Sequence, residues 1–594
     1  MKRLFLLLFA FVAVSITVHA GDVTEQEALL KAQQFLKGKT FKQKNLRRAP
    51  QRNATKKNAP YYVFNAEGND GFVIVSGDDR TEAILGYADK GNLDMDNLPD
   101  NLKAWLSTYE SDLQSIAGKE ISQAPKRLLN HNAIAPLLSS QWGQGAPYNA
   151  LCPEYNNERC VTGCTPTALA QLMYFHKWPE SVNAIAGYES FEELPSTTFN
   201  WNQMQDTYDE GDDASEVAKL MRYCGQAVKA NYTSWGTFVY DDWAWEKVLS
   251  DIFGYDKSLR TVGRNDFLEP SWQELLYEEL KEGRPILYGG YTPGYDGHTF
   301  IVDGFKDGYF HINWGWNGFC DTYFLITVLD PYGSSNPQNG YTVYQKATIG
   351  IKKNGGSIAG TTFKDPKNVF TFQILNENKV WLTEVSKANE NMPYWDDNSY
   401  LTNGSFTIPS TVTYGNHEYQ VTEMGDWDKC YFELYSDAFR EQVYNLVLPE
   451  TLERITHIDV HGPQTLTIPR NVMMLGADAI NSVTIENFNV VADNPYFKSI
   501  DGVIYTKDGE TIVRRPPASK MTTLVIPDGV KHIAKKSVFG SDYLQHLVLP
   551  ETVEGEIEEA ALCDLHALQS LVAEFQSPGC LPVLDGIRDR REAG

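Results

Sequence analysis

The chain has 594 residues, of which 42% are hydrophobic and 22% charged. This length exceeds what one hydrophobic core holds, and the composition is that of folded domains rather than disordered chains. The formal net charge of −25 argues against a nucleic-acid-binding protein, because phosphate binding needs clustered positive charge.

The first twenty residues have the parts of a secretory signal peptide. Lys2 and Arg3 precede an apolar run over 4–18, and we expect cleavage after Ala20. The run is too short and wrongly flanked for a stable membrane span, and residue 21 is glycine rather than the cysteine of a lipid anchor. We therefore expect a protein that is secreted or held at the cell surface, without a membrane span.

Residues 21–130 predict a small α+β unit. A helix should start at Thr24, with Gln26 and Glu27 as capping partners. Two strands around a Gly/Asn/Asp turn are expected over 61–79, and helical spacing returns over 97–116. The stretch that follows holds Lys126-Arg127 and reads as a linker.

Residues 131–354 are rich in Trp, Tyr and Gly, and predict helices first and strands later. The helical patterns cover 165–176, 214–229 and 272–281, and the strand patterns include "RPILYGGY", "HTFIVDGF", "YFHINWGW" and "YTVYQKATIGI". Helices followed by strands predict an α+β domain of two unlike lobes with a cleft between them.

A repeat marks residues 400–594, after an expected linker over 355–399. Five segments share the template apolar-x-apolar-Pro-x-x-apolar, and their spacing is that of leucine-rich repeats with one short strand per repeat. They are 406–412, 446–452, 466–472, 524–530 and 547–553. Residues 494–517 interrupt the array as an expected β-hairpin, and the tail from Cys580 does not continue it.

Cys164 is the candidate nucleophile in "CVTGCTPTALAQLMYFHKWP". It follows Gly163 at the head of a predicted helix, where the helix dipole favours a thiolate. Taken alone, such a cysteine is more often a buried core thiol, and a disulfide with Cys152 or Cys160 is an alternative. A Cys152–Cys160 bridge, which would leave Cys164 free, is the favoured pairing. The eight cysteines form no C-x-x-C pair, which argues against structural zinc.

The other groups of a thiol site come from distant segments. His298, which follows a glycine-rich loop and begins a strand, is the candidate base, and Asn313 is the candidate group that fixes its tautomer. Trp314 and Trp316 would shield that contact from water. Gln144, or Gln141, could stabilise an oxyanion together with the Cys164 backbone N–H. His176 and His311 are interpreted as structural.

These motifs resemble the streptopain family of cysteine peptidases, bacterial relatives of papain. The resemblance rests on "QWGQGAPYN", "TGCTPTALAQLMYFHKWP", "GHTFIVDGF" and "FHINWGWNGFCDTYFLI", and "GFVIVSGDDRTEAILGY" resembles that family's inhibitory prodomain. The order Cys, His, Asn and the separations of about 130–150 residues also match papain-like peptidases. The repeats resemble BspA-type leucine-rich repeats of bacterial surface proteins.

The resemblance implies a papain-like fold and a secreted zymogen with endopeptidase activity that favours hydrophobic residues at P2. It assigns Cys164 as nucleophile, His298 as base and Gln144 as oxyanion donor, with Asn313 and Trp316 in the segment that supports the histidine. No metal or cofactor is implied. The expected partners are protein or peptide substrates, the chain's own prodomain and, through the repeats, host matrix or surface proteins.

Two other functions fit parts of the chain. An adhesin could use the repeats and carry an inactive or secondary peptidase domain, but the intact set of candidate groups argues against it. A papain-fold acyl transferase, which joins rather than hydrolyses peptides, would use the same groups, and only the family motifs argue against it.

Overall fold

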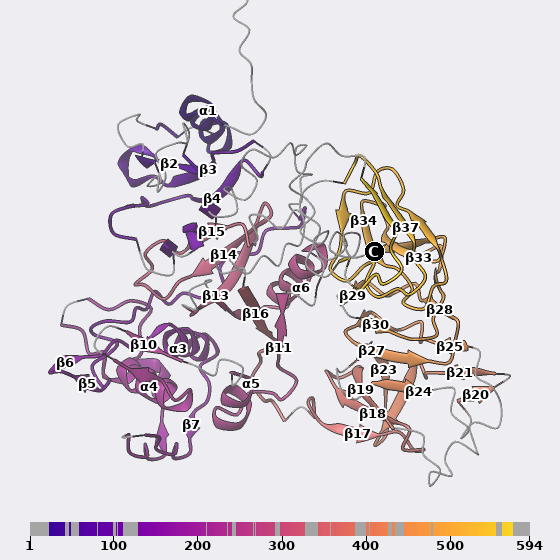
Figure 1. Ribbon diagram of the computed structural model, residues 1–594. Coiled ribbons are helices and arrows are strands. Elements are labelled where there is room, and N and C mark those ends of the chain that lie inside the picture. The colour runs from indigo at the N-terminus through magenta and orange to yellow at the C-terminus, as the bar shows by residue number, and fades with distance from the viewer. Residues whose placement is uncertain are drawn as a thin grey trace, which may run out of the picture.

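The computed structural model describes most of residues 23–573 and separates into an N-terminal unit, a central domain and a C-terminal array (Figure 1). The larger stretches that it leaves undescribed are 1–22, 42–46, 49–58, 111–128, 240–244, 292–296, 327–342, 387–399, 426–429, 434–444, 554–560 and 574–594. The expected signal peptide, the Lys126-Arg127 linker and the Cys580 tail lie outside the described residues. Within them, no helix is both long and apolar enough to cross a bilayer.

One ten-stranded sheet runs through the N-terminal unit and the central domain. Its N-terminal strands are β1 (Arg47–Arg48), β2 (Tyr61–Asn65), β3 (Phe72–Ser76) and β4 (Ile84–Ala88). Its central strands follow in the order β15 (Thr322–Phe324), β14 (Tyr309–Asn313), β13 (Gly297–Lys306), β12 (Ile286–Tyr291), β16 (Val343–Ile349) and β11 (Arg260–Gly263). The two parts meet where β4 pairs antiparallel with β15, so the N-terminal unit extends the edge of the central sheet.

Helix α1 (Glu25–Phe35) begins as the sequence predicts. The Thr24 side chain accepts a hydrogen bond from the Glu27 backbone N–H, and the Glu27 carboxylate accepts one from the Thr24 N–H, which completes a capping box. The helix packs against β2 and β3 of the N-terminal unit.

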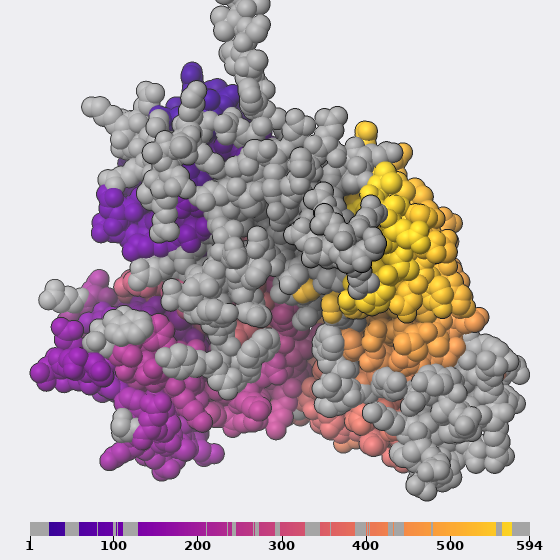
Figure 2. Space-filling model, in the orientation of Figure 1, coloured from indigo at the N-terminus to yellow at the C-terminus, as the bar shows by residue number. Residues whose placement is uncertain are grey.

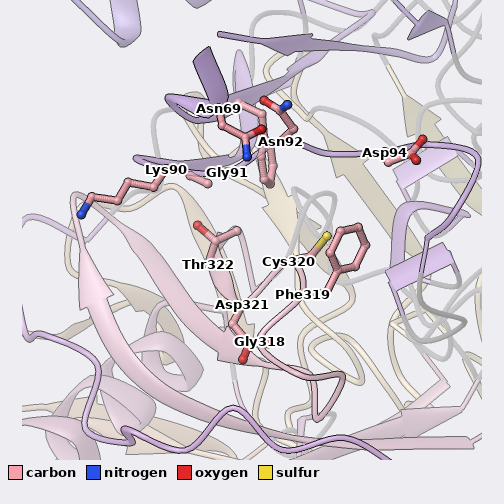
Figure 3. A pocket seen from close by; sticks show the side chains of 12 residues that line it. Asn69, Lys90, Gly91, Asn92, Asp94, Gly318, Phe319, Cys320, Asp321 and Thr322 are labelled. Atoms are coloured by element: carbon pink, nitrogen blue, oxygen red, sulfur yellow. The ribbon is translucent and has the colours of Figure 1, made fainter. Parts of the chain in front are cut away.

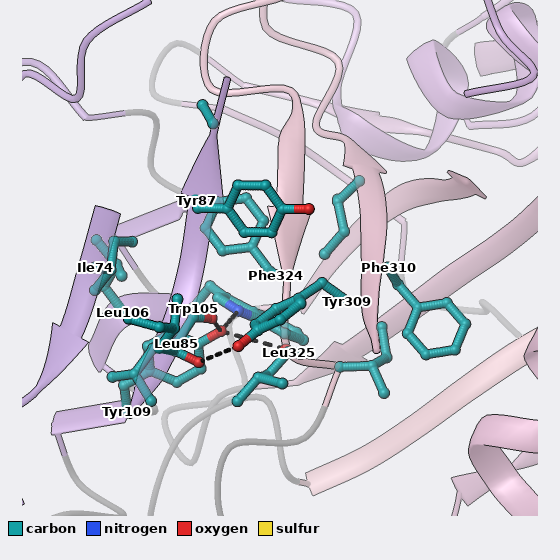
Figure 4. Packing of buried hydrophobic residues seen from close by; sticks show 14 of the residues in the cluster. Ile74, Leu85, Tyr87, Trp105, Leu106, Tyr109, Tyr309, Phe310, Phe324 and Leu325 are labelled. Carbon is teal, nitrogen blue, oxygen red and sulfur yellow. Dashed lines mark hydrogen bonds between the residues drawn. The ribbon is translucent and has the colours of Figure 1, made fainter. Parts of the chain in front are cut away.

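A second helical segment of the N-terminal unit, which carries Trp105 and Tyr109, seals the joint between the two parts (Figure 4). The Tyr109 hydroxyl is 3.0 Å from the Leu85 carbonyl oxygen and 3.3 Å from that of Leu325, so it contacts β4 and the central domain at once. The Trp105 indole donates to the Tyr109 oxygen at 2.7 Å. Apolar residues of both parts therefore form one continuous core rather than two separate ones.

Three helices of the central domain lie where the sequence predicts them: α3 (Cys164–His176), α4 (Ser215–Ala227) and α6 (Glu269–Lys281). Ten of the thirteen α3 residues are buried, which explains why its sequence is apolar nearly all round. Helices α3 and α4 share one apolar cluster with Leu287 and Ile301, whereas α6 shares another with Tyr288 and Phe300. The alternation along β12 and β13 places helices on both faces of this part of the sheet.

The C-terminal array stacks one parallel strand per repeat, as expected. One ladder contains β21 (Ser405–Thr407), β25 (Asn445–Val447), β28 (Thr465–Ile468) and β31 (Asn487–Val490), and a later one contains β35 (Thr523–Val525), β37 (His546–Leu549) and β38 (Ser570–Ala573). The prediction of a two-stranded hairpin over 494–517 is wrong in the number of strands. It has three strands, β32 (Phe497–Ile500), β33 (Val503–Thr506) and β34 (Thr511–Arg514).

The expected linker over 355–399 is folded in its described part. It contains β17 (Thr362–Lys364), β18 (Phe370–Ile374) and β19 (Lys379–Val385), and β19 pairs in parallel with β23 (His417–Met424) of the array. The physical reason is apolar alternation: Phe370, Phe372 and Ile374 are each fully buried in the core of the array.

The remaining elements are short. They are β5 (Glu154–Tyr155), β6 (Glu158–Arg159), β7 (Ser181–Val182), β8 (Thr197–Thr198), β9 (Asn231–Tyr232), β10 (Thr237–Phe238), α5 (Trp245–Lys247), β20 (Leu401–Thr402), β22 (Thr411–Tyr414), β24 (Tyr431–Glu433), β26 (Arg454–Ile455), β27 (Ile458–His461), β29 (Met474–Leu475), β30 (Ile480–Asn481) and β36 (His532–Ile533), with single turns η2 (Glu67–Asn69), η3 (Trp201–Gln203) and η5 (Val248–Ile252).

The array is joined to the central domain by a buried ion-pair network. Glu423 of β23 accepts hydrogen bonds from Arg260 of β11 and, at 3.2 Å, from Arg454 of β26. Burial alone would raise the pKa of Glu423, but the two guanidinium groups outweigh it and lower that pKa. Met474 of the array also packs into the central core. Figure 2 shows the array, in orange and yellow, beside the magenta central domain.

Removal of the Glu423 charge should weaken this joint. A Glu423→Gln variant removes the buried charge that both the Arg260 and the Arg454 guanidinium groups contact, which we expect to destabilise the protein by about 3 kcal/mol. Calorimetry of the full chain measures the effect as a lower melting temperature. The matched control is Glu418→Gln, on the exposed part of the same strand. Equal melting temperatures for the two variants would contradict a stabilising role for the network.

Candidate active site

Helix α3 begins at Cys164 because Gly163 permits the turn that precedes it. Gly163 has φ +89°, and a Cβ there would lie 3.0 Å from the Thr237 methyl carbon. Thr237 is itself fixed, since its hydroxyl donates to the Val161 carbonyl oxygen at 2.6 Å. Only glycine fits both the space and the backbone angle, and the Cys164 thiol is thereby placed at the positive end of the helix.

The Cys164 thiol meets His298, the first expected contact of the site. His298 lies near the start of β13, and both side chains are partly exposed. Burial by itself would raise the pKa of the Cys164 thiol. A hydrogen bond and the charge of His298, a hydrogen bond from the Thr299 backbone N–H and one from the Thr165 side chain outweigh burial and lower that pKa. The environment therefore favours the thiolate.

Cys164 forms no disulfide, and neither do the other cysteines that the structure describes. Cys152 and Cys160 are both free and buried, so the bridge favoured from the sequence is not formed. The Cys152 thiol instead interacts with Tyr232 and lies near Arg222, while burial raises its pKa to about 12. Cys563 and Cys580 lie outside the described residues.

Gln144 lies in a loop that is tied to the residues before Cys164. Its carbonyl oxygen accepts the Thr162 backbone N–H at 2.9 Å, and Asn149 reaches the Cys160 carbonyl oxygen at 3.0 Å. The side chain of Gln141, the other candidate, packs against Gly318. A Cβ atom at position 318 would lie only 2.7 Å from the Gln141 side-chain amide. Gln144 is half-buried, whereas Gln141 is exposed.

The hydrogen bonds that the structure describes for Asn313 go to partners other than His298. On β14 it pairs with Ile301, three residues along β13 from the histidine, which corresponds to about 10 Å of strand. Its amide oxygen accepts from the Gln171 side chain at 2.9 Å, and its amide nitrogen donates to the Ser140 carbonyl oxygen at 2.9 Å. Strand register therefore makes Asn313 a buried link between α3, residue 140 and β14.

The two tryptophans of the same segment differ in position. Trp314 is 1% exposed and packs edge-on against Trp105 of the N-terminal unit and at a tilt against Phe300. Trp316 is partly exposed, and its buried indole N–H has no hydrogen-bond partner among the residues that the structure describes. The backbone N–H of Asn317 donates to the Trp142 carbonyl oxygen at 3.2 Å, so the Trp316 loop adjoins the Gln144 loop.

Two groups near the site were not identified from the sequence. Thr165 and Thr299, which directly follow the two candidate catalytic residues, contact the thiol and each other. His311, interpreted as structural, forms a buried pair with Asp303 at 2.6 Å. Adjacency to Cys164 and His298 was the available signal for the threonines, but only the fold shows that they meet.

The structure also has a cavity of about 340 Å³ at the joint between the N-terminal unit and the central domain (Figure 3). Its walls include Asn69, Lys90 and Asn92 on one side and Cys320 and Asp321 on the other. Burial raises the pKa of Asp321 to about 7. None of the expected site residues lines this cavity, so it is distinct from the Cys164–His298 contact.

Two sequence families match the chain. Residues 142–324 match the Peptidase C10 family, and residues 20–113 match the Spi protease inhibitor family. The first range contains Gln144, Cys164, His298, Asn313 and Trp316.

Individual proteins show the same relationship. The thiol protease/hemagglutinin PrtT of Porphyromonas gingivalis is 31% identical over 399 residues, which cover 61% of this chain and 45% of PrtT. Streptopain of Streptococcus pyogenes is 28% identical over 324 residues, 49% of this chain and 80% of streptopain. The chain thus spans about half the length of PrtT. A prointerpain A fragment of Prevotella intermedia is 27% identical, with a TM-score of 0.44 over 53% of this chain and all of the fragment.

The lowered pKa of Cys164 predicts selective alkylation. Iodoacetamide should modify Cys164 in the folded chain with a pH midpoint below the ordinary thiol value of about 8.5. Fully buried Cys224, whose pKa is raised by burial, should not react. A His298→Ala variant should move the Cys164 midpoint upward, because the thiolate loses its counter-charge. Peptide mapping by mass spectrometry measures both rates, and equal rates for Cys164 and Cys224 would refute the prediction.

Proposed function

We propose, from the match of residues 142–324 to the Peptidase C10 family, that the chain is the zymogen of an exported cysteine endopeptidase with a papain-like, two-lobed catalytic domain. The observation that carries this proposal is the hydrogen bond between the Cys164 thiol and His298 at the head of α3. A thiolate paired with an imidazolium is the nucleophile that such hydrolysis requires.

The proposed mechanism uses groups of this chain alone. His298 takes the proton of Cys164, and the thiolate sulfur forms a bond to the carbonyl carbon of a substrate peptide. The oxyanion is stabilised by the Cys164 N–H, one of the N–H groups that lack a partner within a helix, and by the Gln144 side chain. His298 then protonates the leaving amine, and water hydrolyses the thioester and restores the thiol. Trp316 would cover the histidine side of the groove.

The N-terminal unit is the proposed inhibitor, in accordance with its match to the Spi protease inhibitor family. Its described contacts extend the edge of the central sheet at β15 and place Trp105 against Phe300 and Trp314. Phe300 is two residues from His298 on the same strand. Through this contact the N-terminal unit would alter the position of strand β13 and thereby of His298. Proteolytic removal of the unit would end the inhibition.

A binding role is proposed for the C-terminal array, directed at host matrix or surface proteins. The register of the last ladder aligns Val525, Val548 and Val572 on neighbouring strands, and Val525 and Val572 are 61% and 46% exposed. Apolar side chains in an exposed row are typical of protein-binding surfaces. The ion-pair network at Glu423 would hold such a surface in a fixed position relative to the catalytic domain.

Cleavage of a protein substrate tests the peptidase activity. Full-length chain should mature and degrade casein, and Cys164→Ala should do neither, because it lacks the nucleophile. Cys430→Ala, which removes a buried thiol of the array, is the matched control and should retain activity. Gel electrophoresis and an epoxide inhibitor specific for thiols provide the readouts.

Three outcomes would overturn the peptidase proposal. Wild-type chain that leaves casein intact and resists the epoxide would favour the adhesin alternative. Activity that survives in Cys164→Ala would place the chemistry elsewhere. Peptide joining without hydrolysis would favour the acyl-transfer alternative.

The Trp105 contact predicts faster activation when it is removed. Trp105→Ala deletes a 2% exposed ring that packs against the central domain, and such deletions cost about 3–5 kcal/mol. Maturation of the zymogen should therefore accelerate several-fold. Ser107→Ala, at an exposed position of the same helical segment, is the control, and Trp105→Phe should behave intermediately. Unchanged maturation of Trp105→Ala would show that the contact does not maintain latency.

A further inference from the structure

We propose that Thr165 and Thr299 form a hydroxyl relay that donates a hydrogen bond to the Cys164 sulfur and joins the two elements of the catalytic site. This inference rests on the proposed peptidase function and adds a thiolate-stabilising residue, Thr165, and a positioning residue, Thr299, to the mechanism. We refer to the pair as the threonine clasp.

The clasp joins the two residues that directly follow the catalytic candidates, one on α3 and one on β13. The hydroxyl oxygens of Thr165 and Thr299 are 2.8 Å apart, and each residue is 4% exposed. Thr165 follows Cys164 in the first turn of α3, and Thr299 follows His298 on β13. The clasp therefore fixes the spacing between helix and strand at the point where sulfur and imidazole must meet.

Counting protons determines the direction of the relay. Each threonine hydroxyl has one proton to donate and two lone pairs. The Thr165 side chain interacts with the Cys164 thiol. A thiolate has no proton and can only accept a hydrogen bond, so Thr165 must be the donor when Cys164 is ionised. Its only proton is then engaged at the sulfur, so the 2.8 Å contact must be donated by the Thr299 hydroxyl. The order is Thr299 O–H to Thr165 oxygen, and Thr165 O–H to Cys164 sulfur.

The site has a physical need for this donor. A helix N-terminus ordinarily offers unpaired backbone N–H groups to an anion, but Pro166 in the first turn of α3 has none. The Cys164 side chain is also desolvated, which opposes its charge. Thr165 supplies a hydrogen bond from within the protein, and the Thr299 backbone N–H supplies another. Among the described groups, His298 provides the charge that acts on the thiol.

Side-chain substitutions that preserve shape separate this role from packing. Thr165→Val removes the donor to sulfur, Thr299→Val removes the donor to Thr165, and Thr165→Ser restores a hydroxyl at the first position. The matched control is Thr348→Val, which breaks another threonine pair of 2.8 Å, between β11 and β16 and remote from the thiol. The rate of Cys164 alkylation by iodoacetamide is measured against pH in each variant, with kcat and KM for casein measured separately.

We expect the alkylation midpoint of Thr165→Val to rise by about one pH unit, equivalent to about a tenfold loss of thiolate at low pH. Thr299→Val should shift it in the same direction by less, and the double variant should shift it no more than Thr165→Val, because one chain of hydrogen bonds is broken only once. Thr165→Ser and Thr348→Val should keep the wild-type midpoint. The clasp variants should lower kcat with little change in KM.

Two results would overturn the inference while leaving the peptidase intact. One is a wild-type midpoint in both Thr165→Val and Thr299→Val, and the other is additive shifts in the double variant. If Thr165→Val does not fold, Thr299→Val alone decides, because it leaves the helix head unchanged. Failure of the proposed function is recognised differently, as wild-type Cys164 that alkylates no faster than Cys224 and no cleavage of casein.

Discussion

The contact between the head of helix α3 and the start of strand β13 is the constraint on which the site depends. Cys164 and His298 come from elements of opposite character, a buried helix and a sheet strand, and their meeting requires both to be fixed. Gly163 starts the helix at the correct residue, and the Thr165–Thr299 contact at 2.8 Å holds helix to strand. A shift of one residue in either element would bring a different pair of side chains together at this contact. The chemistry thus follows from packing and register rather than from the two residues alone.

The N-terminal unit does more than lie against the central domain. It supplies four strands to one continuous sheet and shares its core, with Tyr109 bonded to carbonyl oxygens of both parts. Removal of the unit therefore exposes the β15 edge and the aromatic face formed by Phe300 and Trp314. In the proposed zymogen, this shared core would hold the inhibitory unit in place until the chain that follows it is cleaved. The contact of Trp105 with Phe300 connects the unit to β13, the strand that carries His298. On the opposite edge, β11 carries Arg260, through which the repeat array is held.

Local patterns predicted the parts of this architecture that local physics determines. The capping box at Thr24, the helix at Cys164 and the parallel strand of each repeat all follow from spacing and residue type. The failures involve contacts between distant segments. Sequence alone could not show that Asn313 lies opposite Ile301 and bonds to Gln171, and the threonine clasp joins residues 134 positions apart. Residues 355–399 lacked the repeat template and were interpreted as a linker, although their alternating phenylalanines form strands.

The central claim is that the Cys164 sulfur and the His298 imidazole lie next to each other and act as a reactive pair. The most direct test is a crystal structure of the activated protein after reaction with a peptidyl epoxide. We predict a single covalent bond between the Cys164 sulfur and a carbon of the opened epoxide, with the His298 ring within hydrogen-bond reach of the adduct and the Gln144 side chain beside it. An adduct on another cysteine, or a modified Cys164 with His298 turned away and bonded elsewhere, would contradict the account.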